Sequence, residues 1–267
     1  MYGKMRKWDE VLAPYNNAVE ELKVKFKNIR KEFLTKGEYS PIEFVTGRTK
    51  KIASIVSKAK RLNIQDIEAE MEDIAGIRIM CQFVEDIYNI VNLIKLRSDM
   101  TIVYEKDYIK NFKDSGYRSY HVIIKYPINS IAGSKEILCE IQIRTLAMNF
   151  WATIEHSLKY KYEHYIPETL AVRLRRAADA AFLLDQEMSE IREDIMKAQV
   201  MYQVKSVTLR DVLDKIQELY NVGETHKAIK YQRRLDKIDN ERDITEILQL
   251  KKEIDSLLQE YKNKVDD

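Results

Sequence analysis

Cysteine, proline and glycine are scarce in this chain of 267 residues, which contains two, four and seven of them. With so few helix breakers, we expect long helices joined by short connections. Cys81 and Cys139 lie in apolar, strand-like runs without metal-site spacing, so we expect buried free thiols rather than a disulfide framework. No apolar run is long enough to span a bilayer, and the N-terminal sequence lacks a signal-peptide core. We therefore expect a cytoplasmic protein without membrane contact.

A large excess of charge of one sign is also absent. The formal net charge is +2, with 45% hydrophobic and 33% charged residues, so the composition predicts a folded chain without a general affinity for nucleic acid. The sequence has no Gly-rich phosphate loop of the Walker type. No histidine is followed by aspartate, so a hydrolase-type His-Asp pair is not expected. Function must be sought in local clusters.

The spacing of apolar residues predicts an α+β fold. Helices are expected at residues 5–36, 50–62, 85–97, 146–162 and 167–203, and strands at 44–46, 76–83, 100–105, 137–144 and from 120 onward. This order indicates a mixed sheet of about five strands flanked by helices. Beyond residue 205 the chain is polar and helical without strand signals. Residues 1–204 are therefore expected to form one domain, and residues 205–267 a helical C-terminal extension of unknown role.

The segment from Phe44 to Gln65 contains six lysine and arginine residues and no acidic residue. On the predicted helix, Ser54, Lys58 and Arg61 follow one another at gaps of four and three, which places a hydroxyl and two cations along one line. That arrangement suits a triphosphate. A solvated basic face is the alternative, since most charge runs are of that kind, but the missing counter-charges favour phosphate binding.

Polar residues alternate with apolar ones in the predicted central strands. Glu140, Gln142 and Arg144 point away from the apolar side, and Arg78 does the same in its own strand. If these strands are neighbours, Arg78, His121, Glu140 and Gln142 line one cleft. Asp73 lies just before the first of these strands and could join Glu140 on a Mg²⁺ ion. The alternative is an ordinary exposed sheet surface.

The loop KDSGYRSYH, residues 113–121, feeds the strand that begins at Tyr120. It combines cations, hydroxyl groups, a glycine, two tyrosines and a histidine, which suits a phosphorylated ligand that carries an aromatic ring. The two-residue alternation of side chains along that strand then places His121 in the cleft.

Four ordered motifs resemble the synthetase domain of the RelA/SpoT homologue family. They are Gly47-Arg48 with Lys50, the run DIAGIR at 73–78, the run SGYRSYH at 115–121 and the run EIQIRT at 140–145. The resemblance is strongest to small alarmone synthetases of the RelQ type and extends from about Trp8 to about Ala198. It implies a nucleotidyltransferase-like fold and transfer of the β,γ-pyrophosphate of ATP to the 3′-hydroxyl of GTP or GDP. The products would be AMP and the alarmones pppGpp or ppGpp, with no hydrolase activity.

Carried over by position, the site residues of the family divide between two nucleotides. For ATP, the resemblance implies Arg48 and Arg78 on either side of the adenine, and Lys50, Ser54, Lys58 and Arg61 on the phosphates. For the acceptor, it implies Tyr117 stacked on guanine, Lys113 and His121 at the phosphates, and Gln142 beside them. Asp73 and Glu140 would bind Mg²⁺, and Glu140 would help to deprotonate the 3′-hydroxyl.

The same resemblance implies a homotetramer with a central cleft for pppGpp as activator. The positions that map to this cleft are Lys23, Lys27, Arg30, Glu43, Phe44, Thr46 and Asn149. Lys23, Lys27 and Arg30 do form a stripe at helical spacing, although lysines on a helix surface are common. Binding of single-stranded RNA is a further implied property and would use the same basic cleft.

Two other functions compete with alarmone synthesis. A degenerate synthetase fold could serve as a binding module for single-stranded RNA or nucleotide, but no motif position is replaced. An ordinary nucleotidyltransferase would incorporate nucleotides and release pyrophosphate.

Because every motif precedes residue 205, we expect a chain that ends at residue 204 to keep its synthetic activity. The test compares AMP and alarmone formation by the full-length and shortened proteins. A folded shortened protein without turnover would show that the extension takes part in the reaction.

Overall fold

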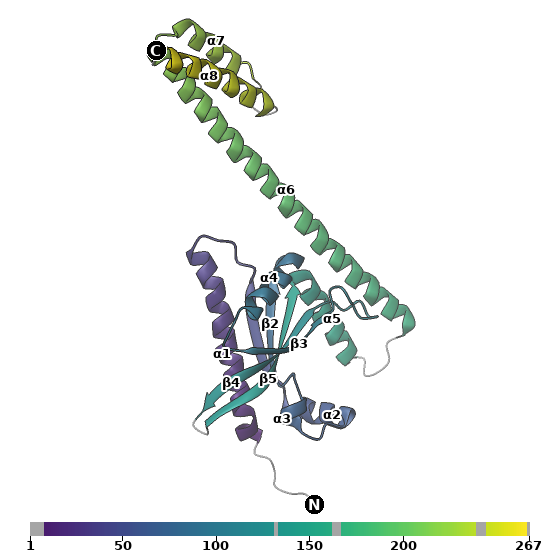
Figure 1. Cartoon of the computed structure of the whole chain (residues 1–267). Helices are drawn as coiled ribbons and strands as arrows, with labels where there is room; N and C mark the ends of the chain where they lie inside the picture. Colours follow the sequence, from purple (N-terminus) through teal and green to yellow (C-terminus); the bar gives the residue numbers. More distant parts are fainter. Residues whose placement is uncertain (1–7, 131–132, 162–166, 239–243, 266–267) are drawn as a thin grey trace, which may run out of the picture. The chain divides into compact units, whose positions relative to one another are not determined.

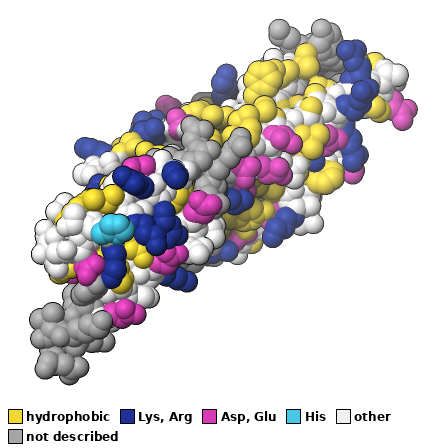
Figure 2. All heavy atoms as spheres, turned by 90° about the horizontal axis from the view of Figure 1, so that it is seen from above, with side chains coloured by type: hydrophobic (Ala, Val, Ile, Leu, Met, Phe, Trp, Pro, Cys, Tyr) yellow, Lys and Arg dark blue, Asp and Glu magenta, His cyan; other side chains and the backbone are white. Residues whose placement is uncertain are grey.

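The computed structural model describes residues 8–130, 133–161, 167–238 and 244–265. The chain forms two compact units, residues 1–190 and residues 191–267. Among the described residues, no helix is long and apolar enough to cross a membrane. Basic and acidic side chains are interspersed over the surface shown in Figure 2, as the small net charge implies.

A single mixed sheet of five strands is the centre of the first unit (Figure 1). Its strands are β1 (Phe44–Thr49), β2 (Ala75–Cys81), β3 (Thr101–Asp107), β4 (Tyr120–Ser130) and β5 (Gly133–Thr145). The order is β1-β2-β5-β4-β3, and β2 runs parallel to β5 while the other neighbours are antiparallel. The predicted α+β class and the number of strands are confirmed.

Helices of the first unit begin and end within a few residues of the expected segments, except that the last one continues well beyond residue 203 and one short helix is added. They are α1 (Trp8–Thr35), α2 (Ile52–Leu62), α3 (Ile67–Glu70), α4 (Val84–Lys95), α5 (Leu146–Lys161) and the first part of α6 (Glu168–Asn221). The unexpected turn α3 forms because the Asp66 carboxylate accepts hydrogen bonds from the backbone N–H groups of Glu68 and Ala69. Pro14 lies inside α1 and does not end it.

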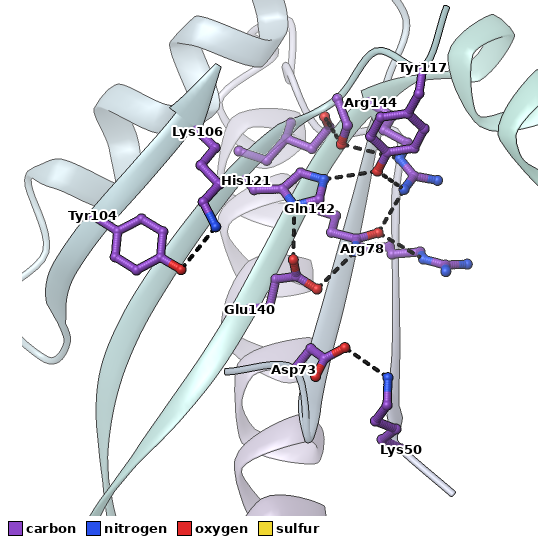
Figure 3. Close-up of polar contacts among 12 residues, drawn as sticks. Lys50, Asp73, Arg78, Tyr104, Lys106, Tyr117, His121, Glu140, Gln142 and Arg144 are labelled. Atoms are coloured by element: carbon purple, nitrogen blue, oxygen red, sulfur yellow. Dashed lines mark hydrogen bonds and ion pairs between the residues drawn. The ribbon is translucent and has the colours of Figure 1, made fainter. Parts of the chain in front are cut away.

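The apolar face of the sheet is covered by α1 and α4. Tyr15, Leu22 and Phe26 of α1 pack in one buried cluster with Ile77 and Ile141 of the central strands. The contact with β1 is close at Gly47, because a Cβ atom there would lie 2.9 Å from both Ile77 Cδ1 and Val19 Cγ1. With one face buried in this way, the polar side chains of the central strands are left on the other face (Figure 3).

Both cysteines are fully buried and free, as the sequence predicts. Burial raises the pKa of the Cys139 thiol to about 12. Burial also raises the pKa of Cys81, and the nearby carboxylates of Asp86 and Asp185 act in the same direction. Neither thiol is a nucleophile at neutral pH.

The second unit contains the C-terminal part of α6, α7 (Thr225–Leu235) and α8 (Ile244–Val265). These helices share an apolar core of their own, formed by Val212, Ile216, Leu219, Ala228, Leu235, Ile247, Leu250, Ile254 and Leu258. Gly223, with a φ of 86°, follows α6 in the left-handed conformation that glycine adopts without strain. Because α6 continues to Asn221, the domain boundary predicted after residue 204 falls inside a helix, and a separate domain from 205 onward stays a prediction.

The close packing at Gly47 gives a stability test. We expect Gly47→Ala to lower the free energy of unfolding by about 1–3 kcal/mol, because the added methyl group overpacks the contact between α1 and the sheet. Gly76→Ala is the matched control on the paired strand, since the nearest atom to its Cβ would be 3.7 Å away. Thermal or urea unfolding of both variants measures the difference, and equal losses would contradict the packing argument.

Candidate active site

The polar face of the sheet gathers side chains from three neighbouring strands. Gln142 of β5 is in register with Arg78 of β2 on one side and with His121 of β4 on the other. Glu140 precedes Gln142 by two residues and therefore shares its face (Figure 3). The four residues therefore share one face of the sheet, and Arg78, Glu140 and Gln142 line one pocket, while a place for His121 in the same cleft stays a prediction.

Glu140 is the acceptor at the centre of this group. Its Oε1 lies 2.8 Å from Nδ1 of His121, and its Oε2 accepts a hydrogen bond of 2.8 Å from the amide of Gln142. Burial acts to raise the pKa of Glu140, but the hydrogen bonds from His121 and Gln142 outweigh burial and hold the pKa below its usual value. The nearby charge of Asp73 opposes this lowering. Glu140 is therefore an ionised carboxylate at neutral pH, close to a second one.

Asp73 precedes β2 and binds two lysines. Nζ of Lys50, which follows β1, and Nζ of Lys58 on α2 each lie 2.8 Å from a different carboxylate oxygen. Burial acts to raise the pKa of Asp73, but the two ammonium groups lower it below its usual value. This cluster brings the basic segment and the carboxylate together, which the sequence alone did not predict.

A pocket of about 290 Å³ lies between these groups and is lined by both carboxylates. Thr46, Gly47, Arg48, Lys50, Asp73, Gly76, Ile77, Arg78, Glu140 and Gln142 form its wall. The pocket has cations on the β1 side and carboxylates on its floor, so it suits a polyphosphate bound together with a divalent metal.

The two carboxylates of the pocket suit a Mg²⁺ ion that a bound nucleotide also helps to hold. Two ionised carboxylates face one pocket, and Mg²⁺ is commonly held by one or two carboxylates together with phosphate and water oxygens. The described residues include no group of three or more histidine, cysteine or acidic side chains that could hold a metal by themselves. A metal at this position would depend on ligands from a bound nucleotide.

Two arginines line the pocket, Arg48 of β1 and Arg78 of β2. Burial and the positive charges of Arg144 and Arg48 lower the pKa of Arg78, so the guanidinium groups lie within electrostatic reach of one another. Ser54 and Arg61 are exposed on α2, and their predicted contact with phosphates stays a prediction.

The loop residues form the other end of the site. The hydroxyl of Tyr117 lies 2.8 Å from Nε2 of His121. The ammonium of Lys113 is 5.0 Å from the centre of the Tyr117 ring and 4.8 Å from that of Tyr108. Tyr108 also packs edge-on against His121, with ring centres 5.1 Å apart. The predicted loop residue Lys113 therefore contacts Tyr117, and Tyr117 bonds to His121, which bonds in turn to Glu140.

Helix α6 holds this loop in place, which the sequence did not predict. The guanidinium of Arg118 lies 4.5 Å from the ring centres of both Phe112 and Phe182 and donates a 3.0 Å hydrogen bond to Asp179. Gly116 has a φ of 85°, and a Cβ atom there would lie 2.6 Å from that of Ala178. The glycine therefore provides both the turn and the close approach to α6.

Arg144 is a site residue that the sequence analysis placed on the polar face without a role. Its Nη2 donates hydrogen bonds of 2.5 Å to the Tyr117 hydroxyl and 2.8 Å to Oε1 of Gln142. The signal for its position was the two-residue period of β5, which runs from Glu140 through Gln142 to Arg144.

The residues predicted for an effector cleft fall on α1, β1, the residue before β1, and α5. On α1, Nζ of Lys23 bonds to Glu20 at 2.9 Å, and Nε of Arg30 donates to the backbone carbonyl of Ile42 at 3.0 Å. Arg30 also lies 4.0 Å from Glu43, which precedes β1. The remaining predicted positions are Lys27 on α1, Phe44 and Thr46 on β1, and Asn149 on α5. Their joint role stays a prediction.

Comparisons with known proteins identify the family of this chain. Residues 47–165 match the family model described as a region found in RelA/SpoT proteins. The GTP pyrophosphokinases YjbM and YwaC of Bacillus subtilis are 55% and 40% identical over 201 and 195 residues, which is 75% and 72% of this chain and 95% and 93% of the relatives.

Solved structures give the same relationship. The small alarmone synthetase 1 of Bacillus subtilis bound to its product pppGpp has a TM-score of 0.69 and 55% identity, and the match covers 72% of this chain and 99% of that one. The same enzyme bound to AMPCPP has a TM-score of 0.64 and 51% identity, with 72% and 100% covered. The family match and the identity over nearly the whole length of these relatives show that the chain belongs to the RelA/SpoT family.

Proposed function

We propose that this protein transfers the β,γ-pyrophosphate of ATP to the 3′-hydroxyl of GTP or GDP and releases AMP. The products are pppGpp or ppGpp. The observation that carries the proposal is the meeting of a cationic phosphate pocket with a tyrosine-bearing loop at one ionised carboxylate, Glu140. The relatives are named GTP pyrophosphokinases, and related structures are described with pppGpp and with an ATP analogue.

On the donor side, Arg48 and Arg78 offer planar guanidinium groups that can stack on adenine. Lys50 and Lys58 offer ammonium groups next to the pocket, where they can offset the charge that builds up during phosphoryl transfer. Ser54 and Arg61 extend this line along α2. Mg²⁺ bound by the two carboxylates would neutralise the phosphates and lower the pKa of the attacking hydroxyl.

On the acceptor side, the Tyr117 ring offers a stacking surface for guanine, worth about 1–3 kcal/mol by analogy with other base-stacking tyrosines. Lys113 and His121 lie next to this ring and can contact the phosphates of the acceptor. Glu140 is placed to take the proton of the 3′-hydroxyl, and Gln142 orients Glu140 through its amide. Positioning of two nucleotides therefore supplies most of the catalysis.

Regulation and assembly form a separate part of the proposal. We propose a homotetramer in which the basic stripe of Lys23, Lys27 and Arg30, together with Glu43, Phe44, Thr46 and Asn149, binds pppGpp as activator. Single-stranded RNA would compete for the basic cleft. Analytical ultracentrifugation with and without pppGpp tests the assembly.

Removal of the proposed base should abolish turnover. We expect Glu140→Gln to lower kcat by at least about a hundredfold, because the neutral amide cannot accept the proton and binds metal poorly. Anion-exchange chromatography of AMP and pppGpp measures the effect. Glu136→Gln is the matched control, since Glu136 is exposed on the same strand. A folded Glu140→Gln protein with normal turnover would contradict the role of Glu140 as the base. A wild-type protein that makes neither product would contradict the proposed function.

The second carboxylate should affect the metal requirement. We expect Asp73→Asn to raise the Mg²⁺ concentration needed for half-maximal rate by about tenfold or more, because one of two charged ligands is lost. Asp214→Asn, the same change at an exposed position in the second unit, should leave the Mg²⁺ dependence unchanged. An unaltered Mg²⁺ titration for Asp73→Asn would remove Asp73 from the metal site.

A further inference from the structure

Five side chains on the polar face form a closed ring of hydrogen bonds (Figure 3). Arg144 bonds to Tyr117 at 2.5 Å, Tyr117 to His121 at 2.8 Å, and His121 to Glu140 at 2.8 Å. Glu140 bonds to Gln142 at 2.8 Å, and Gln142 bonds back to Arg144 at 2.8 Å. Each member therefore has its orientation set by two others.

The chemistry of the members gives this ring one direction. A guanidinium can only donate and an ionised carboxylate can only accept, so Arg144 is the source of hydrogen bonds and Glu140 the final acceptor. On one side the carbonyl of Gln142 accepts from Arg144 while its amide donates to Glu140. On the other side the ionised Glu140 requires the hydrogen on Nδ1 of His121, and the Tyr117 oxygen accepts from Arg144. With a neutral imidazole, Nε2 then accepts the hydrogen of the Tyr117 hydroxyl. Both branches begin at Arg144.

Burial of the Arg144 guanidinium costs free energy, which indicates that the hydrogen bonds it donates are needed. The residue is 5% exposed, and among the described residues no carboxylate lies within ion-pair distance of its guanidinium. Its charge also acts against that of Arg78. Its remaining polar contact is a 3.2 Å bond from Nε to Oγ of Ser119. A buried cation held only by neutral partners does not stabilise a fold by itself.

We propose that Arg144 is a positioning residue of the acceptor half of the site. It holds the Tyr117 ring and the Gln142 amide so that a guanine nucleotide stacked on the ring presents its hydroxyl to Glu140. This inference rests on the proposed function. Arg144 does not itself line the pocket between the two carboxylates and the cations of β1, and it reaches that pocket through Gln142, whose Oε1 also accepts a 3.3 Å hydrogen bond from Nε of Arg78. Its direct bond to Tyr117 lies in the acceptor half, so we expect the larger effect there.

The test measures the binding of GDP and of a non-hydrolysable ATP analogue by calorimetry, which does not require turnover. We expect Arg144→Met to weaken GDP binding by about tenfold or more, the effect of losing a charge-assisted hydrogen bond, with ATP-analogue affinity changed by less than about twofold. Arg144→Lys keeps the charge but not the fork of donors, so we expect an intermediate loss. Steady-state kinetics should show the same split between the two KM values.

A double-mutant cycle with Tyr117→Phe separates positioning from general loss of structure. That change removes only the hydroxyl that accepts from Arg144, so the double variant should bind GDP little more weakly than Arg144→Met alone. Additive losses, or equal loss of both ligands, would overturn the proposal. If Arg144→Met does not fold, Arg144→Lys and Tyr117→Phe form the cycle. If the wild-type protein makes no product, the proposed reaction fails while the binding comparison still decides the role of Arg144.

Discussion

The pairing of β5 with β2 on one side and β4 on the other is the constraint on which the site depends. It brings Arg78 and His121 to the two sides of Gln142, with Glu140 two residues away on the same face. A slip of one residue in either pairing would turn Glu140 toward the core and Ile141 toward the cleft. The cluster of isoleucines against α1 and α4 opposes such a slip, so the core sets the register of the site.

The two halves of the site are held by different parts of the fold. The donor half depends on β1 and α2, where Lys50 and Lys58 converge on Asp73. The acceptor half depends on the loop before β4, which α6 clamps through the pair Arg118–Asp179 and the close approach at Gly116. Glu140 stands between the halves and accepts hydrogen bonds from His121 and Gln142. Arg78 of the donor half donates in turn to Oε1 of Gln142 at 3.3 Å, so Gln142 links the two halves to the carboxylate.

Much of the sheet and its polar face could be predicted because successive side chains of a strand point to opposite faces whatever the strand packs against. That period placed Arg78, Glu140 and Gln142 together before any contact was known. The roles of Ser54, Arg61 and the effector residues came from family resemblance, and no contact in one chain tests them. The change in composition near residue 205 predicts a helix that ends at residue 203, whereas α6 continues to Asn221. The absence of glycine and proline from residues 168–221 was the better guide.

What could not be predicted rests on contacts between distant residues. Arg118 and Asp179 are 61 positions apart, and only the path of α6 brings them together. Asp73 reaches Lys50 through the pairing of β1 with β2 and reaches Lys58 because α2 returns to the start of β2, and a sequence pattern does not specify that return. The ring through Arg144 needs five residues from the loop, β4 and β5 to meet at bonding distance, which depends on the register of β4 against β5.

The burial of both thiols has a practical consequence. Cys81 and Cys139 lie in the core with raised pKa values, so neither competes for a reagent that alkylates exposed thiolates. A single cysteine introduced on the surface would be labelled selectively without first removing the native pair. Spectroscopic probes could then be attached to the loop before β4 or to α8 in an otherwise unaltered protein, and the movement of each part followed during turnover.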